Sequence, residues 1–498
     1  MCGIVGYVGK RDAQPILLGS LSRLEYRGYD SCGIALREGG IRVHKAEGRI
    51  GNLGRRLPPS SSSIGIGHTR WATHGKPSKA NAHPHLDSSG NIAVVHNGVI
   101  DNFHSLREQL TREGHRFSSE TDTEVIPHLI ERHYHGDLMA AVMEALLEVE
   151  GSFALVVLHA DSQELVVARS ECPLIIGMGD KESFIASDVP ALLDHTDKVI
   201  YLEDGDIGLV AGDGVRIINN GRKVEREAHR IPWGLEEAQK GGYEHFMLKE
   251  IHEQPRAIRN TFRGMISAVE PEMDLEVMEG VQFDDMLFLA CGTSYHAALV
   301  GKYAVERLVG IPARVEMASE FNYSDTVLGR TLVVGITQSG ETRDILNALR
   351  RAGGLGCRTV AITNVVGSSV TRLADRTFYI RAGPEISVAA TKSFSAQLTA
   401  LYLLILSLVK ADVRARDNLI EGLRRLPGKV QRVLDGEGEI ARCGKYLSGF
   451  DNVFFIGRGI NLPAALEGAL KLKEVSYIHA EGYAAGELKH GPLALLTP

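Results

Sequence analysis

Regular alternation of strands and helices in the second half of the chain restricts the possible folds more than any other feature. From about residue 284, short apolar runs alternate with segments of helical pattern. The expected strands are 286–291, 332–337, 359–363 and 377–380, and the expected helices are 295–309, 342–352, 369–374 and 391–410. Such alternation predicts a doubly wound α/β parallel sheet, in which ligands bind at the carboxyl ends of the strands.

A second copy of this module is expected to begin near residue 451. Residues 284–309 (DDMLFLACGTSYHAALVGKYAVERLV) and 451–476 (DNVFFIGRGINLPAALEGALKLKEVS) share the order of strand, glycine-containing turn and apolar helix. A supersecondary unit that recurs in this way predicts a second domain of the same kind. The sequence ends where the first copy would begin its second strand, so we expect the second module to be incomplete.

The first half is richer in short strands, which cluster around four helical segments and predict a layered α+β domain. A polar, glycine-containing stretch then reads as a linker. We therefore expect four segments: an α+β domain at 1–217, a linker at 218–250, a first α/β module with its leading helix at 251–425, and an incomplete second module at 426–498.

Composition narrows the class of partner. The net charge of −7 argues against a nucleic acid or a membrane surface as the main partner. The six cysteines are dispersed without a CxxC spacing, so we expect neither a disulfide framework nor a zinc site, and the pattern favours the reducing cytoplasm. The longest apolar helix candidate, 398–409, is too short to span a bilayer. We expect no metal and no cofactor.

Cys2 is the first candidate for catalysis. Once Met1 is removed, one residue carries both a thiol and a free α-amine, whose ordinary pKa of about 8 suits a base. The thiol is then a nucleophile that needs no side-chain base. The alternative is a small buried cysteine at the start of a strand.

Three polar clusters elsewhere in the first half suggest how a substrate could be held. Arg70 could bind a carboxylate by a bidentate pair, and Asp122 could bind an ammonium group. Asn97 and Gly98 follow an apolar strand and could form an oxyanion hole. The alternatives are a surface ion pair for Arg70, a helix cap for Asp122 and a plain turn at Asn97–Gly98.

The second half carries two loops that suit phosphate. Residues 291–294 (CGTS) and 337–342 (TQSGET) each lie between a strand and a helix, where hydroxyls and backbone N–H groups bind anions. Ordinary N-capping by Ser and Thr is the alternative, and no P-loop motif is present. Lys471 and Glu474 lie three residues apart on one helix face, where a solvated salt bridge is the alternative.

Taken together, the motifs at 2–6, 24–31, 68–75, 81–85, 96–98 and 120–124 resemble the glutaminase domain of the N-terminal-nucleophile amidotransferases. Within that group the chain is most similar to the isomerizing glutamine–fructose-6-phosphate aminotransferase family, the glucosamine-6-phosphate synthases. The resemblance implies that Cys2 attacks the glutamine amide and that Asn97 and Gly98 form the oxyanion hole. It further implies that Arg70, Thr73, His74 and Asp122 bind the glutamine and that Trp71 gates the path of the ammonia.

The second half resembles sugar isomerase (SIS) modules. The resemblance implies catalytic roles for Lys471, for Glu474 as the base that moves a proton between C1 and C2, and for His490 of a neighbouring subunit in ring opening. The implied sugar-phosphate ligands are Thr293, Ser294, Gln338, Ser339, Thr342, Val388 and Ala389. The family's usual Ser at the first position of the second loop is Thr337 here, which keeps a hydroxyl.

The activity implied is conversion of L-glutamine and D-fructose 6-phosphate to D-glucosamine 6-phosphate and L-glutamate, the first step of hexosamine synthesis, by a cytoplasmic homodimer that channels ammonia between its halves. The family's C-terminal lysine, which forms an imine with the ketose, is absent from this sequence. We therefore expect C-terminal truncation and an inactive synthase half. Two alternatives stay open: another amidotransferase of the same class, such as a phosphoribosyl type, and a non-catalytic SIS regulator that binds sugar phosphates.

Overall fold

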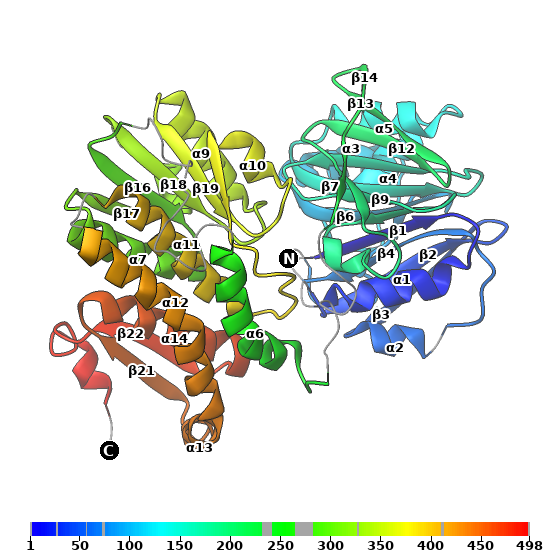
Figure 1. Cartoon of the computed structure of the whole chain (residues 1–498). Helices are drawn as coiled ribbons and strands as arrows, with labels where there is room; N and C mark the ends of the chain where they lie inside the picture. Colours follow the sequence, from blue (N-terminus) through cyan, green and yellow to red (C-terminus); the bar gives the residue numbers. More distant parts are fainter. Residues whose placement is uncertain are drawn as a thin grey trace. The chain divides into compact units, whose positions relative to one another are not determined.

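The computed structural model describes residues 2–25, 28–55, 57–71, 75–231, 242–263, 282–325, 328–409 and 413–496. The chain divides into two compact units, Met1–Ala238 and Gln239–Pro498 (Figure 1). No helix within the described residues is long and apolar enough to cross a membrane.

Two antiparallel sheets form the centre of the first unit. The first has the order β15-β11-β9-β10-β1-β4-β2-β3 and the second β14-β13-β12-β8-β7-β6-β5. The strands of the first are β1 (Gly3–Val8), β2 (Ser31–Arg37), β3 (Ile41–Glu47), β4 (Ile64–Arg70), β9 (Ile175–Met178), β10 (Ser183–Ala186), β11 (Lys198–Tyr201) and β15 (Ala228–Arg230). Those of the second are β5 (His85–Leu86), β6 (Ile92–Ile100), β7 (Gly151–His159), β8 (Leu165–Ser170), β12 (Asp206–Ala211), β13 (Gly214–Asn219) and β14 (Arg222–Val224).

Helices cover the outer faces of these sheets, so the unit has four layers. The period of two along a strand sends alternate side chains to opposite faces. In β7, Ala154 and Val156 pack into the core between the sheets, whereas Leu155 and Val157 pack against the helices. The helices are α1 (Ala13–Ser22), α2 (Ile50–Gly54), α3 (Phe103–Arg112), α4 (Val125–His133) and α5 (Leu138–Leu146), with a short η2 (Val189–Ala191). The predicted layered α+β domain is confirmed.

The second unit is built on a five-stranded parallel sheet of order β17-β16-β18-β19-β20. Its strands are β16 (Asp285–Ala290), β17 (Ala313–Met317), β18 (Thr331–Ile336), β19 (Arg358–Thr363) and β20 (Arg376–Tyr379). Both faces are covered. Met286 and Phe288 pack against helices α7 (Gly292–Leu308) and α11 (Lys392–Leu408). Leu287 and Leu289 pack against α8 (Ala318–Phe321), α9 (Arg343–Gly354) and α10 (Ser369–Leu373). The doubly wound parallel sheet predicted from the sequence is confirmed.

The helices of this unit are α6 (Phe246–Phe262), α7 (Gly292–Leu308), α8 (Ala318–Phe321), α9 (Arg343–Gly354), α10 (Ser369–Leu373), α11 (Lys392–Leu408), α12 (Val413–Asp435) and α13 (Glu437–Leu447). The last segment pairs β21 (Asn452–Gly457) with β22 (His479–Ala484) in parallel and joins them through η5 (Gly459–Asn461) and α14 (Leu462–Ser476), before η6 (Pro492–Leu495). The order of strand, turn and helix expected from residue 451 is therefore present. The boundary expected after residue 425 falls inside α12, because that helix continues to Asp435.

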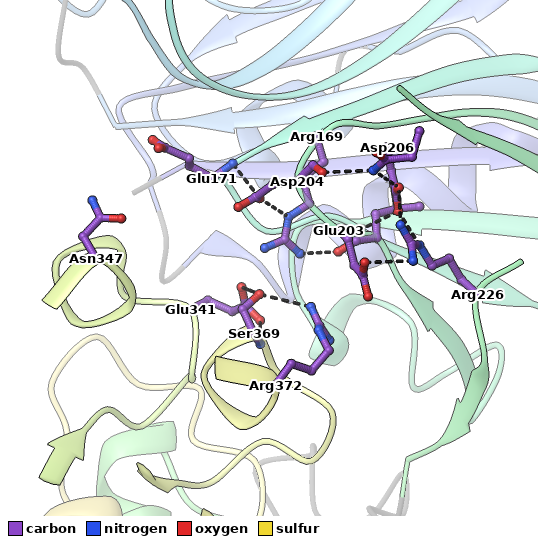
Figure 2. Close-up of polar contacts among 12 residues, drawn as sticks. Arg169, Glu171, Glu203, Asp204, Asp206, Arg226, Glu341, Asn347, Ser369 and Arg372 are labelled. Carbon is purple, nitrogen blue, oxygen red and sulfur yellow. Dashed lines mark hydrogen bonds and ion pairs between the residues drawn. The ribbon is translucent and has the colours of Figure 1, made fainter. Parts of the chain in front are cut away.

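The predicted linker at 218–250 is wrong over its first part. Residues up to Asn219 belong to β13, and β14 and β15 add further strands to the two sheets of the first unit. Arg226 anchors the segment, because its guanidinium contacts the fully buried Asp206 carboxylate at 2.7 and 2.9 Å and Glu203 at 2.8 Å (Figure 2). Polar composition alone predicts a linker. The buried Asp206 carboxylate, however, needs a cationic partner, and Arg226 of this segment supplies it. At the other end of the range, α6 already begins at Phe246.

Candidate active site

Cys2 lies directly before β1, a central strand of the first sheet. Its side chain is partly exposed, and the backbone N–H of Trp71 donates to its Sγ at 3.3 Å. Cys32 offers a contrast, because burial raises the pKa of its thiol to about 12. The alternative of a buried, inert cysteine therefore describes Cys32 and not Cys2.

Asn97 on β6 faces the Cys2 residue. Its Nδ2 donates to the backbone carbonyl of Cys2 at 3.0 Å, and its Oδ1 lies 3.0 Å from His68 Nε2. Burial lowers the pKa of His68 to about 3, so the ring is neutral at physiological pH. Since the Asn97 oxygen only accepts, the one proton of this neutral ring must be on Nε2. His68 therefore fixes the direction in which the Asn97 amide points.

Gly98 follows Asn97 with a φ of +131°, a region that other residues rarely adopt. A Cβ at this position would lie 1.9 Å from the backbone oxygen of Ser152 on β7. The position is therefore restricted to glycine by both conformation and space, which excludes a plain surface turn.

Arg70 ends β4 and is buried. Burial lowers the pKa of its guanidinium, while the electrostatic interactions with Cys2, Asp122 and Asp30 act in the opposite direction. Its Nη2 donates to the carbonyl of Gly75 at 3.1 Å. The alternative of a surface ion pair is excluded by this burial.

Asp122 is also buried, and its Oδ2 accepts the backbone N–H of Ile100 at 3.0 Å. The N-cap position of α4 is Glu124, and no side-chain capping bond is made there. Asp122 is thus directed toward β6 rather than capping α4. A buried cation that interacts electrostatically with Cys2 and with the buried Asp122 carboxylate matches the carboxylate and ammonium groups of an α-amino acid.

Buried hydrogen bonds hold the loop that carries Asp122. The Glu124 carboxylate accepts the backbone N–H groups of Ser118 and Ser119, each at 2.7 Å. Asn81 and Glu120 bond reciprocally, with Glu120 N to Asn81 Oδ1 at 2.9 Å and Asn81 Nδ2 to Glu120 Oε2 at 3.1 Å. The loop is therefore fixed by its own sequence neighbours and by the 81–85 segment.

Four buried histidines behind these residues lie within the motifs at 68–75, 81–85 and 96–98, but the sequence assigned no role to them. His68 stacks on His83 with ring centroids 4.2 Å apart, and His83 Nδ1 accepts the backbone N–H of His96 at 3.3 Å. His96 and His85 reach Thr123 and Thr121 of the Asp122 loop, at 2.7 and 3.1 Å. Burial lowers the pKa of all four rings. They therefore connect β4, β5 and β6 to the loop as neutral hydrogen-bonding groups.

Three residues predicted in or beside the glutamine pocket remain: Thr73, His74 and Trp71. Thr73 and His74 lie outside the described residues. Trp71 is 40% exposed, and its ring meets Tyr29 edge-on at 5.7 Å. An aromatic side chain with this exposure is not a plain core residue.

In the second unit, the two predicted phosphate loops lie side by side. Strands β16 and β18 are adjacent and parallel, with Ala290 opposite Ile336, so the loops that follow them share one edge of the sheet. In the second loop Thr337 Oγ1 and Thr342 Oγ1 are 2.8 Å apart, and the Gly340 N–H donates to Thr337 Oγ1 at 3.2 Å. Glu341 secures this loop by accepting Ser369 N and Oγ at 2.7 and 2.8 Å (Figure 2).

Ordinary N-capping does not account for these hydroxyls. Neither Cys291 at the start of α7 nor Thr342 at the start of α9 makes a side-chain capping bond. Ser339 Oγ instead accepts the N–H of Glu341 at 3.2 Å, and Gln338 uses its backbone oxygen to accept the N–H of Asn364 at 3.1 Å. Ser294 is buried and accepts from Gln397 Nε2 at 3.0 Å, which ties it to α11.

Lys471 and Glu474 face α7 rather than only solvent. Lys471 Nζ contacts Glu474 Oε2, lies 3.0 Å from Thr293 Oγ1 and lies 3.5 Å from Glu467 Oε1. Glu467, which the sequence did not single out, is buried and accepts from Thr293 at 3.0 Å and from His296 Nδ1 at 2.7 Å. A simple exposed salt bridge therefore does not describe this cluster.

The loop before α11 is held by a second buried carboxylate. Glu250 on α6 accepts the backbone N–H groups of Ile386 and Ser387 at 2.6 and 3.1 Å. Burial, followed by the charge of Glu385, raises the pKa of Glu250 to about 7. Val388 in this loop is exposed, whereas Ala389 is buried.

His490 is not brought to the Lys471 cluster. Its side chain is exposed beyond β22, and its backbone N–H donates to the Glu487 carbonyl at 2.9 Å. Among the described residues, no hydrogen bond or ion pair joins its ring to Lys471 or Glu474. Its action on the sugar site of a neighbouring subunit stays a prediction.

Comparison with known proteins defines the class of each unit. Residues 68–194 match the glutamine amidotransferase domain, and residues 282–407 and 446–498 match the SIS domain. The chain is therefore a glutamine amidotransferase unit joined to a sugar isomerase unit.

Relatives carry both units in one chain. The glutamine–fructose-6-phosphate aminotransferase (isomerizing) of Clostridium tetani is 49% identical over 512 residues, covering 100% of this chain and 84% of its own. The enzyme of the same name from Aquifex aeolicus is 50% identical over 502 residues, covering 100% of this chain and 83% of its own. A solved C-terminal domain of glucosamine-fructose-6-phosphate aminotransferase from Francisella tularensis has a TM-score of 0.50 and 42% identity, covering 52% of this chain and 74% of that one. The chain belongs to the glutamine–fructose-6-phosphate aminotransferase (isomerizing) family.

Proposed function

We propose that the two units of this chain carry the sites for one reaction, the transfer of the amide nitrogen of L-glutamine to D-fructose 6-phosphate, giving D-glucosamine 6-phosphate and L-glutamate. The observation that supports this most is the joining of two sites in one chain. A partly exposed Cys2 lies with buried Arg70 and Asp122 in the first unit, and two hydroxyl-rich loops share a sheet edge in the second. Family membership over the whole chain supports the same reading.

In the first half-reaction, Arg70 binds the substrate carboxylate and Asp122 its ammonium group. The Cys2 thiol gives its proton to the α-amine exposed by loss of Met1 and attacks the amide carbon. Asn97 Nδ2 and the Gly98 N–H stabilise the oxyanion, and ammonia leaves as the Cys2 thioester forms. Water then hydrolyses the thioester to glutamate. Thr73 and His74 complete the pocket in this proposal.

In the second half-reaction, Thr293, Ser294, Gln338, Ser339 and Thr342 hold the sugar phosphate, and Val388 and Ala389 line the sugar. Ammonia passes to the second unit with Trp71 as its gate and adds to the C2 carbonyl of the ketose, whose oxygen leaves as water when the C2 imine forms. Glu474 then moves a proton between C1 and C2, while Lys471 offsets its charge. His490 acts from a neighbouring subunit in ring opening, so the proposal includes a homodimer.

The two alternatives are disfavoured by specific observations. A non-catalytic sugar-phosphate regulator does not need a partly exposed cysteine beside an oriented amide. An amidotransferase of the phosphoribosyl type does not need a SIS domain. The dispersed cysteines, none of them in a disulfide in the described chain, support the proposed cytoplasmic location.

Amide-labelled glutamine tests the proposal. The chain is incubated with [amide-¹⁵N]glutamine and fructose 6-phosphate, and glutamate and labelled glucosamine 6-phosphate are assayed separately. Cys2→Ala should abolish release of glutamate while leaving binding of fructose 6-phosphate unchanged. Ser339→Ala combined with Thr342→Ala should weaken sugar-phosphate binding and leave glutamine hydrolysis unchanged. Hydrolysis by Cys2→Ala at the parent rate would contradict the nucleophile assignment.

A further inference from the structure

A cluster of metal-binding side chains lies in the first unit, away from Cys2 in the sequence. His128 and Glu131 lie three residues apart on one face of α4. His115 follows the end of α3, and Ser88 lies in the turn between β5 and β6. The ligand atoms of His115, His128 and Glu131 all lie within 4.8 Å of one another.

Four distances within the cluster are close to the edges of a tetrahedron. Glu131 Oε2 lies 3.0 Å from His115 Nδ1 and 3.6 Å from His128 Nδ1. Ser88 Oγ lies 3.2 Å from His115 Nδ1 and 3.3 Å from His128 Nδ1. A tetrahedral zinc ion with bonds of about 2.0–2.1 Å separates its ligand atoms by roughly 3.3–3.4 Å. These four distances are compatible with a single ion among the four atoms.

The His128 side chain is buried, at 1% exposed, and presents its Nδ1 to the cluster. This Nδ1 lies 3.3 Å from Ser88 Oγ and 3.6 Å from Glu131 Oε2. The second distance is too long for a good hydrogen bond. The His128 nitrogen and the Glu131 oxygen are therefore neighbours without being a hydrogen-bonded pair, as two ligands of one ion are.

Backbone hydrogen bonds fix the orientation of the Glu131 carboxylate in the cluster. The Ser88 and Ser89 N–H groups each donate to the Glu131 carboxylate at 3.1 Å, as hydrogen bonds commonly orient ligating carboxylates.

We propose that His115 Nδ1, His128 Nδ1 and Glu131 Oε2 bind one divalent cation of the zinc class, with Ser88 Oγ or a water molecule as the fourth ligand. Two imidazoles and one carboxylate suit Zn²⁺ better than Mg²⁺ or Ca²⁺, which prefer oxygen ligands. The ion joins the β5–β6 turn to α4 and to the start of the segment that carries Asp122. Its role is structural, and it is independent of the proposed transfer reaction.

Zinc titration of the full chain tests the site. The thiols are first alkylated, so that cysteines do not compete, and Zn²⁺ binding is measured against a chromogenic chelator. The parent chain should bind one equivalent, and the metal should raise its unfolding temperature. His115→Ala and Glu131→Gln should each weaken binding at least tenfold and remove the thermal shift.

His133→Ala is the matched control. His133 lies on the same helix, and its ring contacts Glu144 and Glu148 at 3.1 and 2.7 Å, outside the cluster. This variant should bind zinc as the parent does. Circular dichroism on all variants verifies that the fold is retained. The proposal is overturned if the parent binds no zinc, if His115→Ala and Glu131→Gln bind it as tightly as the parent, or if His133→Ala weakens it equally.

Discussion

His68 offers the sharpest test of the glutaminase geometry, because it acts only through Asn97. In His68→Ala the Nε2 donor is lost and the buried Oδ1 of Asn97 is left without the partner that lies 3.0 Å away. An unsatisfied buried acceptor costs about 1–3 kcal/mol. If the Asn97 amide turns away from the position in which it binds the oxyanion, this whole free-energy cost is added to the barrier of glutamine hydrolysis. At 1.36 kcal/mol per tenfold, kcat for glutamine hydrolysis should fall by roughly 5- to 150-fold.

The size of this effect has an upper limit in Asn97 itself. Removal of an oxyanion-hole donor typically reduces kcat by about 10²–10³. His68→Ala should therefore reduce kcat by less than Asn97→Ala does. Because Arg70 and Asp122 are unchanged, KM for glutamine should stay close to the parent value. Burial holds the pKa of His68 at about 3, so no step from this residue is expected in the pH profile near neutrality.

His68→Gln is the control that separates positioning from packing. A glutamine Nε2 can occupy much the same place as the histidine Nε2 and still donate to Asn97. It should restore most of kcat, whereas His68→Leu, which fills the space without a donor, should not. Glutamate release is measured by a coupled assay at saturating glutamine, with thermal unfolding of each variant as a check. An unchanged kcat in a folded His68→Leu protein would refute the reasoning.

Three further results are expected. The pKa of Glu250 is raised from an ordinary value near 4.5 to about 7 in the folded chain. Between pH 4.5 and 7 the folded state therefore keeps a proton that the unfolded state has lost. Stability should therefore fall by up to about 3 kcal/mol as pH rises from 4.5 to 7, and Glu250→Gln should flatten this dependence in chemical unfolding. Iodoacetamide at pH 8 should modify Cys2 with loss of glutamine hydrolysis and leave Cys32 unmodified in peptide mapping, since the Cys32 pKa is about 12. Arg226→Ala should destabilise the first unit by about 3–5 kcal/mol, because it leaves the buried Asp206 charge without its cationic partner. An unchanged free energy of unfolding would restore the linker interpretation.

The pH dependence at Glu250 matters for the sugar site as well as for stability. Glu250 accepts the N–H groups of Ile386 and Ser387, directly before Val388. Ionisation near neutral pH strengthens these hydrogen bonds and adds repulsion from Glu385. The loop proposed to line the sugar is therefore held by a group that titrates close to physiological pH.

The sequence by itself determined the elements whose pattern is local. The parallel-sheet strands β16, β18, β19 and β20 are continuous apolar runs between helices, and each lies within two residues of its expected place. Cys2, Arg70, Asn97 and Asp122 were singled out because their chemistry is apparent from residue type and neighbours. In the structure Asn97 bonds to the Cys2 carbonyl, and Arg70 interacts electrostatically with Cys2 and Asp122.

Only the tertiary structure decided which distant groups complete each site. His68 and Asn97 are 29 residues apart, Thr293 and Glu467 are 174 apart, and no periodicity links either pair. Segment 218–230 reads as a linker because its residues are polar, yet the buried charge of Asp206 draws Arg226 into the first unit. Local composition fixes whether a segment can be a strand or a helix. The satisfaction of buried polar groups depends on partners that only folding brings together.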